Sequence, residues 1–318
     1  NLAMNRRYRI AFVSFRSLDA AYFAPTVEEG IRQAVRDYGD HGLAVETYIS
    51  SAEHPGQQAE DIRQAFDSGI RDFVIACADA EQLKPVLLRL RKQACRVILL
   101  SKYAGPDTCD TFIGADDQKS GRLAAEVLGH MIPGNGSVQI LVPRESRSNQ
   151  QSTRQRLEGF LAGIRALRPS IRLLPPLEAR DSPAGIAEAL SDILSTRRPD
   201  GIYDLTCRLE IISRTLRRKG MEDTSLVGMD LFPEIVPFIR DHTIDAVIFQ
   251  NLKAQAYLAC RLLFEQMCYG TTLPQKTCYS RLEIVMSGNL EYYLEESLLP
   301  SSQNATALAA ATFRESTP

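Results

Sequence analysis

Short apolar segments alternate with amphipathic segments along most of this chain. Residues 9–15 form a β-rich apolar run, and in the segment that follows it Val27, Ile31 and Val35 recur at the spacing of one helix face. The same pair of a strand and a helix then repeats several times. Because such alternation is typical of parallel sheets with right-handed crossovers, it predicts an α/β fold with helices on both faces of each sheet.

A break at residues 133–136 (Pro-Gly-Asn-Gly) divides the predicted elements into two sets. The first set has strands at 9–15, 43–49, 72–78, 95–101 and 111–116 and helices at 26–38, 56–68, 81–93 and 119–131. The second set has strands at 137–143, 171–176, 201–206, 225–230 and 245–250 and helices at 152–167, 183–196, 207–219 and 232–240. A helix at 253–268 and a last strand at 281–287 complete the pattern.

We therefore expect two doubly wound parallel-sheet lobes joined by crossover strands, with a ligand-binding crevice at the carboxyl ends of the strands. The first lobe is predicted to comprise residues 9–131 and about 252–278, and the second residues 132–250 and about 279–293. Residues 299–318 are small and polar, and they are predicted to form a disordered tail.

The charge balance gives this chain no nucleic-acid surface of its own. Lys and Arg number 37 against 39 Asp and Glu, and the formal net charge is −2. Because no basic field results, any contact with DNA must come from another part of the protein.

No apolar run approaches the roughly 20 residues of a membrane span, and the first ten residues lack the apolar core of a signal peptide. Neither a membrane span nor export is therefore expected.

Cysteine and histidine usage predicts a reduced protein without a metal or a cofactor. The seven cysteines are an odd number without a CxxC pair, and most lie in apolar segments: Cys77, Cys95, Cys109, Cys207, Cys260, Cys268 and Cys278. We interpret them as buried thiols of a cytoplasmic protein. No two of the four histidines have the spacing of a metal pair. The motifs GxGxxG, GxxxxGKS/T and GxSxG are also absent, which favours a binding protein over an enzyme.

Three short motifs occur in the order in which one protein family has them. They are Phe112–Gly121 (FIGADDQKSG), Arg156–Phe160 (RLEGF) and Val227–Asp230 (VGMD). Together with the restart of the pattern near the middle, they resemble the lac repressor (LacI/GalR) family, whose type I periplasmic-binding-protein fold is shared by exported sugar-binding proteins. The resemblance covers about residues 1–290. It implies the ligand-sensing domain of a bacterial transcriptional repressor, which binds a small sugar or related effector in the inter-lobe cleft and couples closure to operator binding.

The start of the sequence bears on the choice between a repressor and a transport protein. Leu2 and Ala3 precede the first strand at the distance that the family's hinge helix has, so residues 1–8 resemble the end of that hinge. The hinge leucine of the family enters a kinked minor-groove step. The resemblance thus implies a helix-turn-helix head outside this sequence and a homodimer on near-palindromic operators. The alternatives are a vector remnant before Met4 and, for function, the sugar-binding component of an ABC transporter.

The resemblance also implies a ring of four polar ligand-binding residues, namely Asp116, Arg156, Asp230 and Gln250. The aspartates would accept from sugar hydroxyls, the arginine would donate in pairs, and the glutamine would close the hinge side. Each residue has an alternative role. Either aspartate could cap the helix that follows it, the arginine could be solvated, and the glutamine could have another buried partner.

Further candidates lie in loops after strands. The first such loop holds Ser14, Arg16, Asp19, Tyr22 and Phe23, where Tyr22 or Phe23 would either stack on a sugar ring or join the core. Asp204 lies near a family asparagine that touches ligand, although the sequence Tyr-Asp-Leu departs from the usual triplet there. Arg144 and Arg147 follow another strand and indicate an acidic or phosphorylated sugar, unless they are solvated loop residues.

Overall fold

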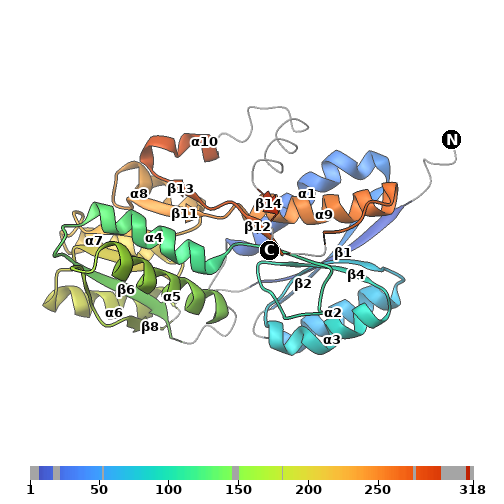
Figure 1. The fold of residues 1–318 in the computed structure, drawn as a ribbon, viewed down its shortest axis with the longest axis horizontal. Coiled ribbons are helices and arrows are strands. Elements are labelled where there is room, and N and C mark those ends of the chain that lie inside the picture. Colours follow the sequence, from blue (N-terminus) through green and yellow to red (C-terminus); the bar gives the residue numbers. More distant parts are fainter. Residues whose placement is uncertain are drawn as a thin grey trace. The chain divides into compact units, whose positions relative to one another are not determined.

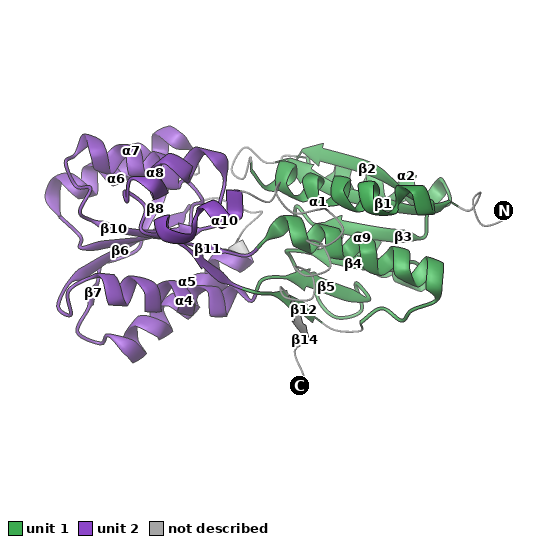
Figure 2. Cartoon of the chain, turned by 90° about the horizontal axis from the view of Figure 1, so that it is seen from above, with its two compact units in different colours: residues 1–115, 251–281, 299–318 green, residues 116–250, 282–298 purple. Residues whose placement is uncertain are grey.

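The computed structural model describes residues 7–16, 22–51, 54–144, 150–180, 182–274, 277–294 and 313–315. The chain divides into two compact units, shown in separate colours in Figure 2. Unit 1 comprises residues 1–115, 251–281 and 299–318, and unit 2 comprises residues 116–250 and 282–298. Within the described part of the chain, no helix combines the length and the apolar character that crossing a membrane requires.

Unit 1 is a seven-stranded sheet of order β14-β12-β5-β4-β3-β1-β2. Its strands are β1 (Tyr8–Arg16), β2 (Leu43–Ser51), β3 (Asp72–Ala76), β4 (Arg96–Leu100), β5 (Thr111–Gly114), β12 (Thr277–Ser280) and β14 (Phe313–Glu315). All neighbours pair in parallel except β14, which runs antiparallel to β12. Its helices are α1 (Phe23–Tyr38), the 3-10 turn η2 (Gly39–His41), α2 (Pro55–Asp67), α3 (Ala80–Lys92) and α9 (Leu252–Tyr269).

The strands of unit 1 are apolar on both faces because helices cover both. In β1, Ile10 and Phe12 pack with α1 and α9, whereas Ala11 and Val13 pack with α2 and α3. Figure 1 shows these two helix layers on opposite sides of the sheet. A strand buried on both faces has no polar alternation, and this is why the sequence shows continuous apolar runs.

Unit 2 has strands in the order β13-β11-β10-β9-β6-β7, and β8 also pairs with β6. These are β6 (Ser137–Pro143), β7 (Arg172–Leu173), β8 (Leu177–Ala179), β9 (Gly201–Asp204), β10 (Ser225–Met229), β11 (Ala246–Phe249) and the antiparallel edge strand β13 (Glu283–Val285). Its helices are α4 (Asp117–Met131), α5 (Gln150–Leu167), α6 (Pro183–Thr196), α7 (Leu209–Arg218), α8 (Val236–Arg240) and α10 (Glu291–Leu294), with 3-10 turns η4 (Pro233–Ile235) and η5 (Ser287–Asn289). Helices α4 and α5 cover one face, and α6, α7 and α8 lie on the other (Figure 2).

The predicted α/β fold with two doubly wound sheets is confirmed, and the differences are local. Of the predicted strand 281–287 only residues 283–285 form a strand, β13, and the preceding strand β12 (Thr277–Ser280) was not predicted; the chain crosses from unit 1 to unit 2 between the two, at Arg281 and Leu282. The predicted helix 232–240 is a 3-10 turn followed by the short helix α8. Pro233 is the first residue of the turn and Pro237 the second residue of α8, and proline lacks the amide proton that a continuous helix needs.

The boundary between the units differs from the prediction. The sequence pattern predicts residues 116–131 in the first lobe, but the structure groups α4 with unit 2. Ala124, Ala125 and Leu128 of α4 belong to the same core as the strands of unit 2, and this packing decides the assignment. In the tail that was predicted to be disordered, residues 313–315 form β14, and the rest lies outside the described residues, as do Leu2 and Ala3.

Two glycines let α4 and α5 approach until their backbones touch. A Cβ added at Gly121 would overlap the carbonyl oxygen of Arg156, and one added at Gly159 would overlap the carbonyl oxygen of Gln118. A real side chain would therefore separate the helices. This gives a physical reason for the glycines in two of the motifs noted above.

We expect Gly159→Ala to destabilise the protein by about 1–3 kcal/mol or more, because overpacking forces the two helices apart. Urea unfolding followed by circular dichroism measures the loss. The matched control is Gly134→Ala, since a Cβ at Gly134 meets nothing within 4 Å. Equal midpoints for the two variants would contradict the close contact.

Candidate functional site

The carboxyl ends of three neighbouring strands of unit 2 carry buried polar residues. Strand β9 ends at Asp204, β10 is followed by Asp230, and β11 is followed by Gln250. Since β9, β10 and β11 are parallel neighbours, their carboxyl ends lie on one edge of the sheet. These three residues are 0%, 3% and 6% exposed, so their polar atoms must be satisfied within the protein or by a ligand.

Arg156 on α5 lies at this edge and forms an ion pair with Asp117 at the start of α4. The Arg156 Nε to Asp117 Oδ1 distance is 2.7 Å, and the two side chains are 12% and 9% exposed. Burial by itself would lower the pKa of Arg156, but the negative charges of Asp117 and Asp230 raise it, and the net shift is upward. Arg156 is therefore a permanent cation, not a solvated surface arginine.

Asp230 and Gln250 contact each other directly. Gln250 Nε2 donates to Asp230 Oδ2 at 2.8 Å, so the amide orients the carboxylate. Asp230 has φ of 63°, in the left-handed region that costs energy for a residue other than glycine. The turn η4 that follows β10 has Phe232, not Asp230, at its N-cap. The structure thus places Asp230 beside Gln250 and within electrostatic range of Arg156.

Asp116 and Asp204 hold the backbone at helix starts. Asp116 is the N-cap of α4, where its Oδ1 accepts from the Lys119 amide at 3.0 Å and its Oδ2 lies 3.2 Å from the ammonium of the same lysine. Asp204 accepts from the amide and hydroxyl of Thr206 at 2.8 and 2.6 Å and from the Arg208 amide at 3.1 Å. Of the two adjacent aspartates in the FIGADD motif, it is therefore Asp117 that pairs with Arg156.

Tyr203 also belongs to this edge, although the sequence analysis did not select it. Its ring stacks on Phe160 with centroids 4.4 Å apart and planes 15° from parallel, and the residue is fully buried. Burial raises the pKa of Tyr203. Among the described residues its hydroxyl has no hydrogen-bond partner, which leaves a buried donor beside Arg156. Phe160 belongs to the RLEGF motif on α5, but the motif does not reveal which residue of the sheet its ring contacts.

The carboxyl end of β1 in unit 1 carries the first-loop candidates. Ser14 is fully buried, and its carbonyl oxygen accepts from the Ser50 hydroxyl at 3.5 Å. Phe23 stacks on Phe15 with centroids 5.5 Å apart, so one face of its ring is already covered. Tyr22 and Phe23 both pack against the core formed by α1 and α9. Asp19 lies outside the described residues.

The candidate arginines of the loops differ in their surroundings. Arg16 is exposed and lies 3.7 Å from Glu28. Arg144, directly after β6, is exposed and lies 3.8 Å from Glu178. Such exposed pairs are worth at most about 1 kcal/mol, and either cation is free to turn toward a ligand. Arg147 lies outside the described residues.

Lys102, after β4, was missed in the sequence analysis. Its Nζ donates to the carbonyl oxygen of Ala78 at 3.0 Å and lies 4.8 Å from the centroid of the Phe15 ring. Burial lowers the pKa of Lys102 to about 8. A lysine in a loop is usually solvated, and no pattern in the sequence distinguished this one. The neighbours that bury it come from strands far apart in the chain.

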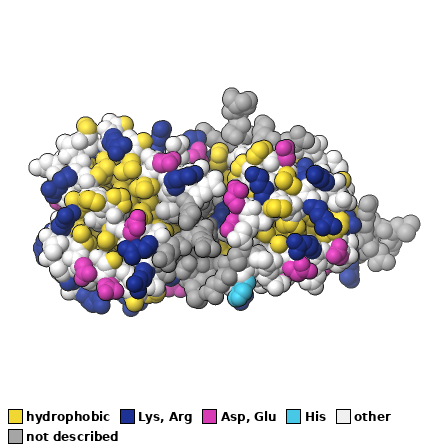
Figure 3. Space-filling view, turned by 90° about the horizontal axis from the view of Figure 1, so that it is seen from below, with side chains coloured by type: hydrophobic (Ala, Val, Ile, Leu, Met, Phe, Trp, Pro, Cys, Tyr) yellow, Lys and Arg dark blue, Asp and Glu magenta, His cyan; other side chains and the backbone are white. Residues whose placement is uncertain are grey.

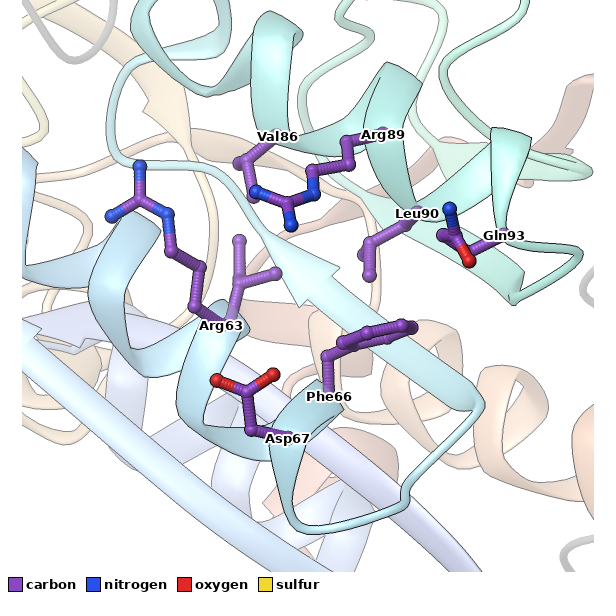
Figure 4. A pocket seen from close by; sticks show the side chains of 8 residues that line it. Arg63, Phe66, Asp67, Val86, Arg89, Leu90 and Gln93 are labelled. Atoms are coloured by element: carbon purple, nitrogen blue, oxygen red, sulfur yellow. The ribbon is translucent and has the colours of Figure 1, made fainter.

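A surface groove of unit 1 lies away from these strand ends. It has a volume of about 120 Å³ between α2 and α3, with Ile62, Phe66, Val86 and Leu90 as its apolar lining (Figure 4). On the molecular face drawn in Figure 3, basic side chains are interspersed with acidic ones and do not gather into one positive patch. Nothing at this groove resembles the buried polar clusters described above.

Within the described ranges, no group of three or more His, Cys, Asp or Glu residues is arranged to hold a metal ion.

A periplasmic binding protein domain model matches residues 10–271. The chain belongs to this family. Its two doubly wound sheets are the type I periplasmic-binding-protein fold, and the strand-end residues of both units occupy the edges where doubly wound sheets bind ligands.

The proteins that this chain resembles in sequence or fold carry different names. A D-ribose/D-allose-binding protein of Pseudomonas aeruginosa is 24% identical over 260 residues, which cover 78% of each chain. A Bacteroides fragilis protein assigned as a LacI transcriptional regulator has TM-score 0.80 and 18% identity, over 91% of this chain and all of that one. A carbohydrate transporter binding protein of Agrobacterium radiobacter, solved with D-arabinose, has TM-score 0.77 and 16% identity, over 93% of this chain and 100% of that one. At these identities the structural matches establish the fold.

Removing the Arg156 side chain leaves the buried Asp117 carboxylate without its cation. We expect Arg156→Ala to cost about 3–5 kcal/mol of unfolding free energy in the absence of ligand. The matched control is Arg154→Ala on the same helix, since the Arg154 side chain is 72% exposed. That variant is expected to stay within about 0.5 kcal/mol of the parent. Similar losses in both variants would refute a buried ion pair.

The pKa of Asp204 is raised from 3.8 to about 6, chiefly because it is buried. The folded state therefore holds a proton that the unfolded state has lost between these values, and Asp204 reduces stability as pH rises through this range. Asp204→Asn should remove this pH dependence, because asparagine does not titrate. The difference in unfolding free energy between the parent and the variant should therefore fall by up to about 3 kcal/mol from pH 4 to pH 6.5. Parallel pH profiles of the two proteins, measured by urea unfolding, would argue against the shift.

Proposed function

We propose that this chain is the ligand-sensing domain of a LacI-type transcriptional repressor, and that it binds a small sugar or a related polyhydroxy effector. The observation that carries the ligand part is the buried cluster of Arg156, Asp117, Asp230 and Gln250 at the strand-end edge of unit 2. A sugar hydroxyl both donates and accepts hydrogen bonds. Carboxylates can accept from it, a guanidinium can donate to it, and an amide can do either.

Each member of the cluster has a specific role in this proposal. Asp230, held by Gln250, accepts from ligand hydroxyls, and Arg156 donates its remaining N–H groups to ligand oxygens. Tyr203 offers a buried hydroxyl beside them. Asp116 and Asp204 act indirectly, because their carboxylates hold the starts of α4 and α7 in place. Further candidates for ligand contact are Ser14, Asp19, Tyr22 and Phe23 in unit 1 and the loop residue Arg144 in unit 2.

The thiols favour the repressor over the alternative, a sugar-binding component of an ABC transporter. None of the seven cysteines, all of which lie in the described ranges, is joined in a disulfide, although Cys109, Cys207 and Cys268 are partly exposed. Cysteines without disulfides accord with a reducing compartment such as the cytoplasm, whereas oxidising compartments favour disulfides. Leu2 and Ala3 fit the end of a hinge helix, as the sequence analysis proposed. The relatives include both classes and do not decide between them.

In the repressor, ligand binding would shift the population of conformations and so change the affinity of the DNA-binding head for its operator. Such coupling requires that the ligand prefer one conformation over the other. A homodimer would present one head to each operator half-site. No cofactor, metal or catalytic step is part of this function, and the chain acts as a binding protein, not an enzyme.

Calorimetric titration with pentoses, hexoses, polyols, sugar acids and sugar phosphates tests the ligand part. We expect one chemical class to bind, and we expect Asp230→Asn to weaken that binding by about 10-fold or more, because a charge-assisted hydrogen bond is lost. The matched control is Asp223→Asn, an exposed aspartate at the opposite end of β10. Unchanged affinity in Asp230→Asn would remove the proposed site.

The regulatory part is tested with the protein encoded by the complete gene. We expect it to retard DNA from its own promoter region in an electrophoretic mobility shift, and we expect the ligand found above to change the midpoint. Recovery of the protein from the periplasm, without any DNA retardation, would favour the transporter alternative and leave the ligand site untouched.

A further inference from the structure

Three short segments of the described chain connect unit 1 with unit 2. The chain passes between the units at residues 115–116, 250–251 and 281–282, and we call these places the first, second and third crossing. Because the chain is continuous there, any change in the arrangement of the units must be taken up by backbone rotation in or next to the crossings. The contacts that hold the ends of the crossings therefore decide how such a change can proceed.

Backbone pairing joins the crossings only in twos. In unit 1, β5 and β12 are parallel neighbours with Gly114 opposite Tyr279, so the first and third crossings leave side by side. In unit 2, β11 and β13 are antiparallel neighbours with Phe249 opposite Glu283, so the second and third crossings are joined there. The second crossing enters unit 1 through the helix α9, and among the described residues no strand pairing attaches it to the other two at that end.

Two buried side chains supply the missing attachment. Gln255, in the first turn of α9, donates from its Nε2 to the Ser280 hydroxyl at 3.1 Å, and this hydroxyl donates to the Gly114 carbonyl oxygen at 3.3 Å. Gln255 is 1% exposed and Ser280 is 5% exposed, so water does not compete for these hydrogen bonds. Gln255, Ser280 and the carbonyl of Gly114, which we call the clasp, thus tie together the unit 1 ends of all three crossings.

The ligand cluster of unit 2 is attached to two of these crossings. Asp117, which pairs with Arg156, follows Gly114 of the clasp by three residues. Gln250 precedes Gln255 of the clasp by five residues. A ligand that binds the cluster therefore acts on residues that lie only a few positions along the chain from the clasp.

The helix starts beside these two crossings are also fixed. Asp116 caps α4 by accepting from the Lys119 amide at 3.0 Å, and Asn251 caps α9 by accepting from the Ala254 amide at 3.0 Å. Asn251 has φ of 53°, in the left-handed region. Since the caps and the clasp hold both sides of these crossings, the backbone that remains to rotate is short.

We propose that Gln255 and Ser280 are positioning residues for the ligand cluster, because their clasp makes the three crossings turn as one when a ligand binds at Asp117 and Gln250. This inference rests on the proposed ligand-binding function and adds how the site acts on unit 1. Without the clasp, a ligand would pull on the first and second crossings separately. With it, the units share one hinge, and a ligand favours one arrangement of that hinge over another.

Hydrogen exchange of the whole ligand-free chain, read by mass spectrometry, tests the clasp directly. Ser280→Ala removes both of its hydrogen bonds. We expect amide exchange to become about 10-fold faster in all three segments that contain crossings, because each loses an attachment at its unit 1 end. These segments are residues 111–117, 250–257 and 277–285. Faster exchange only around residue 280 would overturn the inference.

Three further variants separate positioning from a general loss of stability. Gln255→Met releases only the second crossing, so exchange should rise mainly in residues 250–257, because the bond from Ser280 to the carbonyl remains. Ser280→Thr keeps the hydroxyl and should restore the exchange of the parent. Ser50→Ala is the matched control, since the buried Ser50 hydroxyl also donates to a backbone carbonyl of unit 1, and it should leave the three segments unchanged.

Strand β3, in the middle of the unit 1 sheet, reports on general stability. Its exchange should be the same in Ser280→Ala as in the parent. Acceleration of β3 equal to that of the crossings would mean that the clasp only stabilises unit 1, and it would overturn the inference.

The last test adds D-ribose, D-xylose, D-glucose and D-galactose as probes. A sugar that binds should slow exchange in all three segments of the parent, but in Ser280→Ala only in the two that contain Asp117 and Gln250. Slowing of those two segments alone in the parent would overturn the inference and leave the proposed function intact. If neither these probes nor the wider panel above bind, the proposed function fails, and the exchange of the ligand-free chain still decides whether the clasp joins the crossings.

Discussion

The contact between α4 and α5 is the constraint on which the site in unit 2 depends. Without side chains at Gly121 and Gly159 the two backbones touch, and this brings Arg156 on one helix within 2.7 Å of Asp117 on the other. A wider spacing would leave a guanidinium and a carboxylate separately buried, each at a cost of several kcal/mol. Close helix packing therefore makes a buried charge pair tolerable, and the pair in turn places a fixed cation beside the ends of β9, β10 and β11.

Sheet topology supplies the remaining members of the cluster. Since β10 and β11 are parallel neighbours, the residues that follow them meet at one edge, and Asp230 can accept from Gln250. The left-handed backbone at Asp230 is a cost that this contact helps to sustain. The capping aspartates Asp116 and Asp204 contribute in a different way, because they fix where α4 and α7 begin. Capping of the backbone and pairing of side chains are thus divided between adjacent residues, since Asp116 caps α4 and Asp117 pairs with Arg156.

Much of the fold was predictable from the sequence because strands buried on both faces and amphipathic helices leave strong local patterns. The crossover between β12 and β13 was not, since Arg281 and Leu282 lie in one continuous β-rich segment. At the site, the motifs led to Arg156 and Asp230, but Asp116 and Asp117 are adjacent and equally polar, and only the helix register shows which faces Arg156. Lys102 and Tyr203 depend on neighbours distant in the chain, and such burial has no local signature.

The two strand-end cations differ in how the protein holds them. Arg156 Nε lies 2.7 Å from the carboxylate of Asp117, so the charge of this arginine is compensated within unit 2. Lys102 in unit 1 instead donates to the carbonyl oxygen of Ala78 and lies 4.8 Å from the centroid of the Phe15 ring. A charged group that is removed from water costs free energy unless such contacts replace its hydration. An ion pair replaces more of that hydration energy than a carbonyl and a ring do, which is why the pKa of Arg156 is raised and the pKa of Lys102 is lowered.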